Sequence, residues 1–150
     1  MGQICEMPQG NASCEEIRRI LAASRTVAVV GLSDKPARAS YQVAAYLQDQ
    51  GYRILPVNPG LVEVLGEKAY PDLKAVPEPV DIVDVFRRSD AMPGIVEQAI
   101  AIGARVIWMQ EGIVHNPAAE SARAAGLAVV MSKCLLKEHR RYLNPGVSDA

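Results

Sequence analysis

TVAVVGLSDKPARAS, residues 26–40, is the stretch that decides the fold. A β-branched apolar run ends at Gly31, a short polar loop carries Ser33, Lys35 and Arg38, and a helical pattern follows. Glycine lets the backbone turn tightly and approach a ligand, and a helix start presents free N–H groups to an anion. The order of strand, glycine turn and helix predicts a phosphate-binding loop at the opening of a doubly wound nucleotide-binding fold.

The loop departs from the dinucleotide-binding fingerprint. After Gly31 the G-x-G-x-x-G spacing requires glycines at positions 33 and 36, where the chain has Ser33 and Pro36. NAD-binding units also place an acid at the end of the second strand, to bind the ribose hydroxyls. Here that position is Asn58, and no arginine stands there to meet a 2′-phosphate. An NAD(P)-dependent oxidoreductase is therefore disfavoured.

Composition limits the partners that can be expected. A chain of 150 residues that is 49% hydrophobic can build one well-buried core, so we expect a single domain. With 16 basic and 17 acidic residues the formal charge is -1, which gives no electrostatic case for nucleic acid or an anionic membrane. The N-terminal MGQICEMPQG lacks the pattern of a secretory signal, and a cytoplasmic location is expected. Three cysteines without C-x-x-C spacing predict no metal site.

Apolar β-rich runs alternate with amphipathic patterns along the chain. This alternation predicts an α/β, Rossmann-like doubly wound fold, with a mostly parallel sheet of five or six strands covered on both faces. The expected strands are 27–30, 53–57, 82–86, 106–109 and 128–131, with a short one at 68–70, and the expected helices are 14–23, 40–49, 89–102, 116–126 (with Asn116 as N-cap) and 135–142. We expect the domain to span residues 13–142, with loose ends at 1–12 and 143–150.

Ligands of such sheets bind beyond the carboxyl ends of the strands, where the strand order reverses. The segments expected at that edge are 31–33, 58–59, 87–88 and 110–112. Serine hydroxyls and backbone N–H groups suit a pyrophosphate, the basic side chains supply charge, and Asn58 or Gln110 suits a ribose or base. Each basic residue taken singly is more simply a solvated surface group. Their convergence on one edge nevertheless indicates a site for a nucleotide diphosphate.

Five segments, in order and at matching spacing, resemble a known family. They read VAVVGLSDKPARASYQVAAYLQDQGYRILPVNPG, EVLGEKAYPDL, PVDIVDVFRRS, GARVIWMQEGIV and AGLAVVMSKCLLKEHRRY. The chain from about Ser13 to Tyr142 resembles the small stand-alone CoA-binding proteins, which are related to the N-terminal domain of the succinyl-CoA synthetase α subunit. This chain departs from the family pattern in two places: it reads Ser132-Lys133-Cys134 where an acid and an arginine usually precede the cysteine, and Glu111 adds an acid to a loop that is commonly apolar.

The resemblance implies a Rossmann-like domain that holds coenzyme A, with GLS at the phosphates and NP, VFR and Q-x-G lining the cleft. The residues expected to bind CoA or acyl-CoA are Gly31, Leu32, Ser33, Lys35, Arg38, Ser40, Asn58, Pro59, Val85, Phe86, Arg87, Gln110 and Gly112. A β-branched side chain at Gly31 is expected to block the phosphates and to leave the fold largely intact, unless the glycine has positive φ.

No catalytic constellation is evident in the sequence. The synthetase that the chain resembles uses a phosphorylated histidine on a second domain and a separate nucleotide-binding subunit, and neither is visible in these residues. His115 lies beside a helix start, and His139 is expected to form a helix-terminal salt bridge. We therefore predict non-catalytic CoA binding. Three different functions stay open beside it: the disfavoured NAD(P)-dependent oxidoreductase, a partner-dependent acyl-CoA ligase subunit, and a redox protein that forms a mixed disulfide between Cys134 and CoA. A protein partner or a homo-oligomer is left open.

Overall fold

Five parallel strands form the central sheet of the computed structural model, which describes residues 7–144. They are β1 (Thr26–Val30), β2 (Arg53–Val57), β5 (Ile82–Val85), β6 (Val106–Met109) and β7 (Ala128–Val130), and they lie in the order β2-β1-β5-β6-β7. Val27 of β1 pairs with Ile54 on one side and Ile82 on the other. The predicted parallel sheet is confirmed, with five strands. Of the ends predicted to be loose, residues 1–6 and 145–150 lie outside the described residues.

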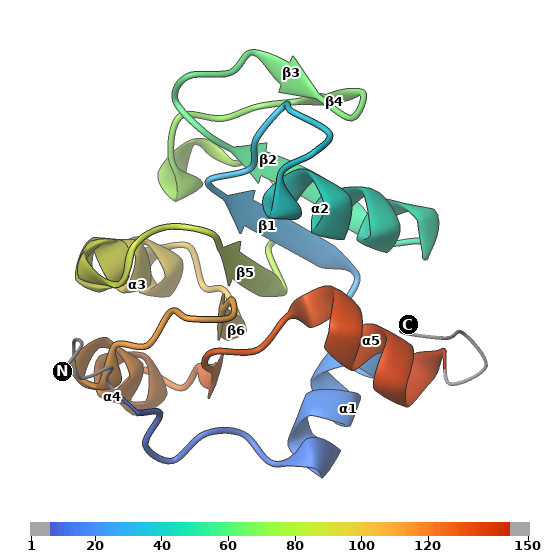
Figure 1. The fold of residues 1–150 in the computed structure, drawn as a ribbon. Coiled ribbons are helices and arrows are strands. Elements are labelled where there is room, and N and C mark those ends of the chain that lie inside the picture. Colours follow the sequence, from blue (N-terminus) through green and yellow to red (C-terminus); the bar gives the residue numbers. More distant parts are fainter. Residues whose placement is uncertain (1–6, 145–150) are drawn as a thin grey trace, which may run out of the picture.

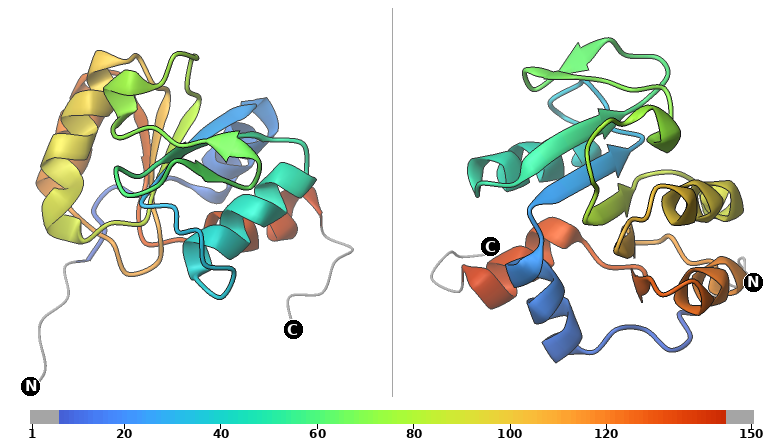
Figure 2. Two further views of the ribbon diagram at one scale, coloured as in Figure 1. Left: turned by 90° about the horizontal axis from the view of Figure 1, so that it is seen from above. Right: turned by 180° about the vertical axis from the view of Figure 1, so that it is seen from behind.

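Helices cover both faces of the sheet (Figures 1 and 2). One face packs against α1 (Cys14–Ala23), α2 (Ala39–Asp49) and α5 (Leu135–Leu143), and the other against α3 (Met92–Ala101) and α4 (Asn116–Ala124). Side chains alternate along each strand, so Val27 and Val29 face the first layer while Ala28 and Val30 face the second. The Rossmann-like three-layer architecture predicted from the sequence is therefore confirmed. None of the helices within residues 7–144 is long and apolar enough to cross a membrane.

The segment between β2 and β5 differs from the prediction. A small antiparallel hairpin of β3 (Glu63–Val64) and β4 (Glu67–Lys68) stands where one strand at 68–70 was expected. Leu65 and Gly66, both with positive φ, form its two-residue turn, which is the geometry that a tight hairpin requires. Beyond the hairpin, Tyr70 bridges to Val57 at the end of β2. Short 3-10 turns follow at Leu73–Ala75 and Ser89–Ala91.

The prediction of the α4 N-cap was wrong by one residue. His115 is the cap, and its Nδ1 accepts a hydrogen bond from the Ala118 N–H at 3.0 Å. Asn116 lies inside the helix because its amide is used elsewhere: it donates to the Met7 carbonyl and accepts from the Gln9 N–H. At α1 the N-cap is Ser13, whose hydroxyl accepts from the Glu16 N–H at 3.1 Å.

Candidate functional site

The strand order reverses between β1 and β5. From β1 the chain runs outward to β2 and then crosses back to β5 on the other side of β1. The carboxyl ends of β1 and β5 are therefore the switch point at which doubly wound sheets bind ligands. Gly31 directly follows β1, and its N–H donates to the Val57 carbonyl at 2.9 Å. Phe86 directly follows β5, and its N–H donates to the Val30 carbonyl at 2.9 Å.

Gly31 sits where two chain segments come very close. Its φ is +88°, in the region that favours glycine. A Cβ atom at this position would lie 2.7 Å from the Phe86 carbonyl oxygen and 3.0 Å from Cδ of Arg87. Both the backbone conformation and the contact with the loop after β5 therefore require glycine.

A hollow of about 360 Å³ opens beside Gly31 at the start of α2, and we call it the α2-side hollow. It is lined by Gly31, Ser33, Lys35, Arg38, Ala39, Ser40 and Phe86. No lining residue is acidic. Lys35 and Arg38 are exposed, and neither has an ion-pair partner among the residues that the structure describes. The hollow therefore carries two uncompensated positive charges.

The first turn of α2 adds unpaired donors to this hollow. No side chain caps the helix, and its first internal bond runs from the Gln42 N–H to the Arg38 carbonyl at 3.1 Å. The N–H groups of residues 39–41 consequently have no partner within the described chain. The loop before the helix is already ordered, because the Ser33 N–H donates to the buried Ser40 hydroxyl at 3.0 Å. Free helix N–H groups beside two cations form an arrangement suited to anions.

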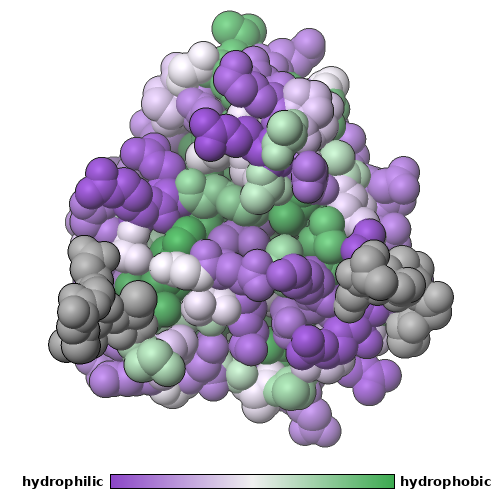
Figure 3. Space-filling model, in the orientation of Figure 1, coloured by the Kyte–Doolittle hydropathy of each residue, from purple (hydrophilic) through white to green (hydrophobic). Residues whose placement is uncertain are grey.

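A second hollow, of about 240 Å³, opens at the same strand ends but toward α3, and we call it the α3-side hollow. Its lining residues are Val30, Val57, Pro59, Pro71, Asp72, Leu73, Arg87, Ala91, Gly94, Ile95 and Gln98. Arg87 lines this hollow while its Cδ closely approaches Gly31 of the other, so the two hollows meet at this pair. Apolar surface gathers near the middle of the otherwise mostly hydrophilic face shown in Figure 3.

Asn58 ties the loops around the two hollows together. Its Nδ2 donates to the Leu32 carbonyl at 2.9 Å, and its Oδ1 accepts from the Gly60 N–H at 2.8 Å. Its own N–H donates to the Tyr70 carbonyl at 2.8 Å. Sequence reasoning proposed this amide for a ribose or base, whereas both of its polar atoms are used within the fold.

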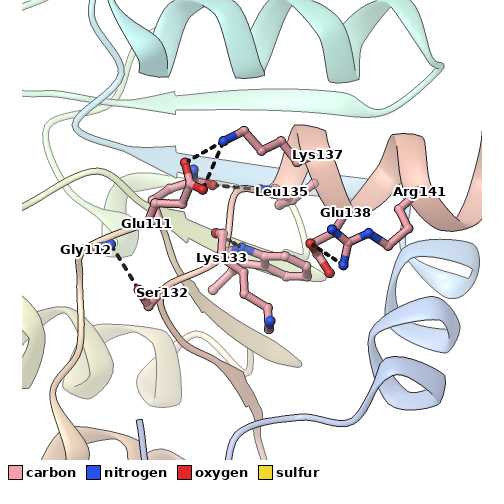
Figure 4. A network of polar contacts seen from close by, with 10 residues as sticks. Glu111, Gly112, Ser132, Lys133, Leu135, Lys137, Glu138 and Arg141 are labelled. Carbon is pink, nitrogen blue, oxygen red and sulfur yellow. Dashed lines mark hydrogen bonds and ion pairs between the residues drawn. The ribbon is translucent and has the colours of Figure 1, made fainter. Parts of the chain in front are cut away.

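Gln110 and Gly112 line neither hollow. The buried Gln110 side chain accepts from the Leu135 N–H at the start of α5, and the Gly112 N–H donates to the Ser132 hydroxyl at 3.1 Å. Glu111 pairs with Lys137 at 3.1 Å (Figure 4). These contacts tie the loop after β6 to the loop after β7. Leu32 and Val85 are fully buried, and their carbonyls accept from Asn58 Nδ2 and the Gln110 N–H, so neither residue is open to a ligand in this structure.

The candidate reactive groups His139 and Cys134 line neither hollow. His139 is not in the predicted salt bridge: it is buried, its Nδ1 lies 2.8 Å from the Tyr46 hydroxyl, and burial lowers the pKa of its imidazole. Cys134 is the N-cap of α5 and packs partly buried against the core. Trp108 is fully buried.

Several residues at the site were missed by sequence reasoning. Asp72, Gly94 and Gln98 line the α3-side hollow, and the one available signal was a glycine directly after Pro93 in a helical pattern. Asp84, in the middle of β5, lines neither hollow; it is fully buried, and neither carboxyl oxygen has a partner among the described residues. Burial raises the pKa of this carboxyl well above its ordinary value.

Comparison with known proteins gives consistent matches. Residues 25–140 match the model of a family described as "CoA binding domain". The chain is 45% identical over 129 residues to the uncharacterized protein YneT of Bacillus subtilis, covering 86% of this chain and 96% of YneT. It is also similar in structure to a hypothetical protein from Pyrococcus horikoshii, with a TM-score of 0.87, 38% identity, and coverage of 95% of this chain and 99% of the other.

A third match is to part of a larger enzyme. The chain is 30% identical over 122 residues to the α subunit of acetate–CoA ligase (ADP-forming) I of Pyrococcus furiosus. The match covers 71% of this chain and 26% of that subunit. The relationship to the α subunit of an acyl-CoA synthetase, expected from the sequence, is confirmed for this part of the subunit.

Proposed function

This chain belongs to the family of CoA-binding domains, and from that premise we propose that it binds coenzyme A or an acyl-CoA at the carboxyl ends of β1 and β5. The observation that carries the proposal is the α2-side hollow, where unpaired N–H groups of α2 meet two unpaired cations and no acid. A pyrophosphate is the part of CoA that needs such a site. In this proposal Lys35 and Arg38 supply the charge, and the N–H groups of the first turn of α2 supply the hydrogen bonds.

The other residues expected from the sequence take less direct roles in the proposal. Pro59 and Arg87 border the ligand from the α3-side hollow, and Phe86 does so from the α2-side hollow. Asn58 and Gln110 hold the surrounding loops, because their hydrogen bonds are made within the protein. The same bonds of Asn58 support CoA over NAD: the residue directly after β2 is this asparagine and not an acid, and its amide is not free for a ribose.

Two ligands and three variants test the binding proposal. CoA at 100 times its Kd should stabilise the folded protein by about 2.7 kcal/mol and raise the melting temperature by several degrees, while NAD should do so less. Lys35→Ala and Arg38→Ala should each weaken CoA binding about five- to tenfold in calorimetric titration, because each removes one charged contact. Arg18→Ala, on the exposed side of α1, is the matched control and should bind as wild type. Equal stabilisation by NAD, or unchanged affinity in both loop variants, would contradict the proposal.

We propose further that binding occurs without turnover. The placement of both histidines supports this: His115 caps α4, and His139 is buried against Tyr46. The purified chain, incubated with CoA, ATP and a panel of carboxylic acids, or separately with acyl-CoAs, should neither make nor cleave a thioester above the buffer rate. Turnover that is lost in Cys134→Ser would instead favour thiol chemistry at that residue, and turnover that persists in it would require a catalytic group elsewhere.

A further inference from the structure

A short polar segment covers the β7 edge of the sheet. β7 stands at one end of the strand order. Residues 7–12, which we call the strap, run from α4 on one face of the sheet to α1 on the other and cross this edge (Figures 1 and 2). At the crossing the Asn11 side chain takes the place of a strand: its Nδ2 donates to the Met131 carbonyl at 2.9 Å, and its Oδ1 accepts from the Met131 N–H at 2.9 Å.

The strap is held mainly by polar contacts near the surface. Arg123 Nη2 donates to the carbonyls of Gln9 and Gly10 at 3.1 and 3.0 Å, and both bonds are exposed to solvent. Ala12 packs partly buried against the core, while Met7 is 73% exposed. Segments with exposed hydrogen bonds and little buried apolar surface open at low cost. The strap is therefore a cover that can lift without unfolding the sheet.

The backbone at this edge is complementary to a second copy of itself. The Ala128 N–H donates toward β6, to the Arg105 carbonyl at 3.0 Å, so the backbone groups of Val129 and Met131 point to the outer side. The N–H and carbonyl of Val129 have no partner within the described chain. In an antiparallel pair centred on Val129, the two copies exchange two bonds there, and each Met131 N–H meets the Leu127 carbonyl of the other copy. The strap occupies Met131 and so blocks this pairing.

Charges on α4 favour the same pairing. α4 packs beside β7, and Arg123 and Glu120 lie one turn apart on it. Glu120 is exposed and has no ion-pair partner among the residues that the structure describes. A two-fold axis at this edge sets the two α4 helices antiparallel, so the Arg123 that the strap releases meets Glu120 of the second copy.

The opposite edge of the sheet is closed in a different way. The Arg53 N–H of β2 donates inward to the Arg25 carbonyl at 2.8 Å, so Pro56 presents its outer side, where it lacks an N–H. The Pro56 carbonyl accepts from the Tyr70 N–H at 2.9 Å. A proline and a bridging segment are permanent protections against strand addition. Of the two edges, the one at β7 is the edge that can be uncovered.

We propose that the β7 edge is a docking surface for a second copy of this chain, and that the strap guards it. When the strap lifts, two copies join antiparallel through residues 127–131 into one continuous sheet. Neither hollow is lined by a residue of β7 or of the strap, so the candidate ligand site stays open in the pair.

Asn11→Asp tests the guard. It keeps an acceptor for the Met131 N–H but sets an oxygen against the Met131 carbonyl, so the open fraction of the strap should rise about tenfold. A dimer needs both straps open, and its dissociation constant should therefore fall about 100-fold in analytical ultracentrifugation. Asn11→Ala should act in the same direction. Gln50→Ala, at an exposed amide beyond α2, is the matched control and should associate as wild type.

Two further measurements locate the contact. In Asn11→Asp the Val129 amide should exchange its hydrogen more slowly as protein concentration rises, because it gains a partner in the dimer. Adding Glu120→Arg to Asn11→Asp should weaken the dimer about tenfold, since like charges then face each other.

The outcomes decide between guarded pairing and its absence. If Asn11→Asp and Asn11→Ala, folded by circular dichroism, associate no more strongly than wild type or than Gln50→Ala, the strap guards nothing. A dimer in which exchange at Val129 is independent of concentration, or one that Glu120→Arg leaves unchanged, would refute pairing through this edge.

Discussion

Replacing Gly31 should destabilise the fold before it can report on ligand binding. Sequence reasoning alone predicts a blocked but folded protein. The structure changes that expectation, because φ at Gly31 is +88° and a Cβ atom would lie 2.7 Å from the Phe86 carbonyl oxygen. A non-glycine residue with left-handed backbone costs about 1–2 kcal/mol. Overpacking against a backbone atom that cannot turn away costs about 1–3 kcal/mol more.

Gly31→Ala should therefore lose about 2–5 kcal/mol of unfolding free energy, a large part of the roughly 5–15 kcal/mol of an ordinary domain. For a chain of this length the melting temperature should fall by about 4–20 °C, measured by differential scanning calorimetry without ligand. Urea titration at 25 °C should give the same loss with an unchanged m-value. A Gly31→Ala protein that melts within about 2 °C of wild type would refute the argument, since both the backbone conformation and the close approach would then be wrong.

Three further substitutions test other features. Asp84→Val should raise unfolding free energy at pH 7 by about 2 kcal/mol, since it removes a buried, unpartnered carboxyl. Because burial raises the folded-state pKa of Asp84, the unfolding free energy of wild type should fall as the pH rises above 3.8, the ordinary pKa of the group. The stabilisation by Asp84→Val, measured by urea titration, should therefore shrink as the pH is lowered toward 3.8. Asn58→Asp should weaken CoA binding without any gain for NAD in calorimetry, because it loses the donor to the Leu32 carbonyl. Glu111→Gln should tighten CoA binding by less than about twofold, because Glu111 follows β6, two strands from β1 and about a Debye length away. In about 1 M salt the substitution should have no effect on CoA affinity, since salt screens the remaining repulsion.

The sequence was sufficient for the layers of the fold because each layer follows a local rule. Continuous apolar runs such as residues 106–109 indicate strands buried on both faces, and the turn at Gly103 marks where α3 ends. The hairpin at 63–68 was missed because its turn is made by Leu65 and Gly66, and leucine rarely adopts the positive φ that such a turn requires. Its strands have two residues each, too few to show an alternating pattern.

The site was predictable in part for the same reason. Parallel strands end at one edge, so the loop from Gly31 to Arg38 could be placed beside Phe86 from topology alone. The hydrogen-bond partner of each polar side chain could not be derived from topology. Asn58 and Gln110 are the right types of residue at the right edge, yet their amides satisfy backbone groups that come from distant segments. Those pairings depend on loop conformations, which single-residue preferences do not determine.

The contrast between α2 and α5 shows where this edge can hold an anion. Both helices begin at the same edge of the sheet and on the same face, and neither is capped by the side chain of its own N-cap residue. At α5 the Leu135 N–H is taken by Gln110, and Glu111 brings a negative charge beside Lys137. At α2 the first N–H groups have no partner within the described chain, and the nearby Lys35 and Arg38 are unpaired. Exposed N–H groups cost little while water solvates them, and they need no rearrangement to receive phosphate oxygens. We therefore propose α2, and not α5, as the helix that binds an anion at this edge, while the loops before α5 hold the fold together.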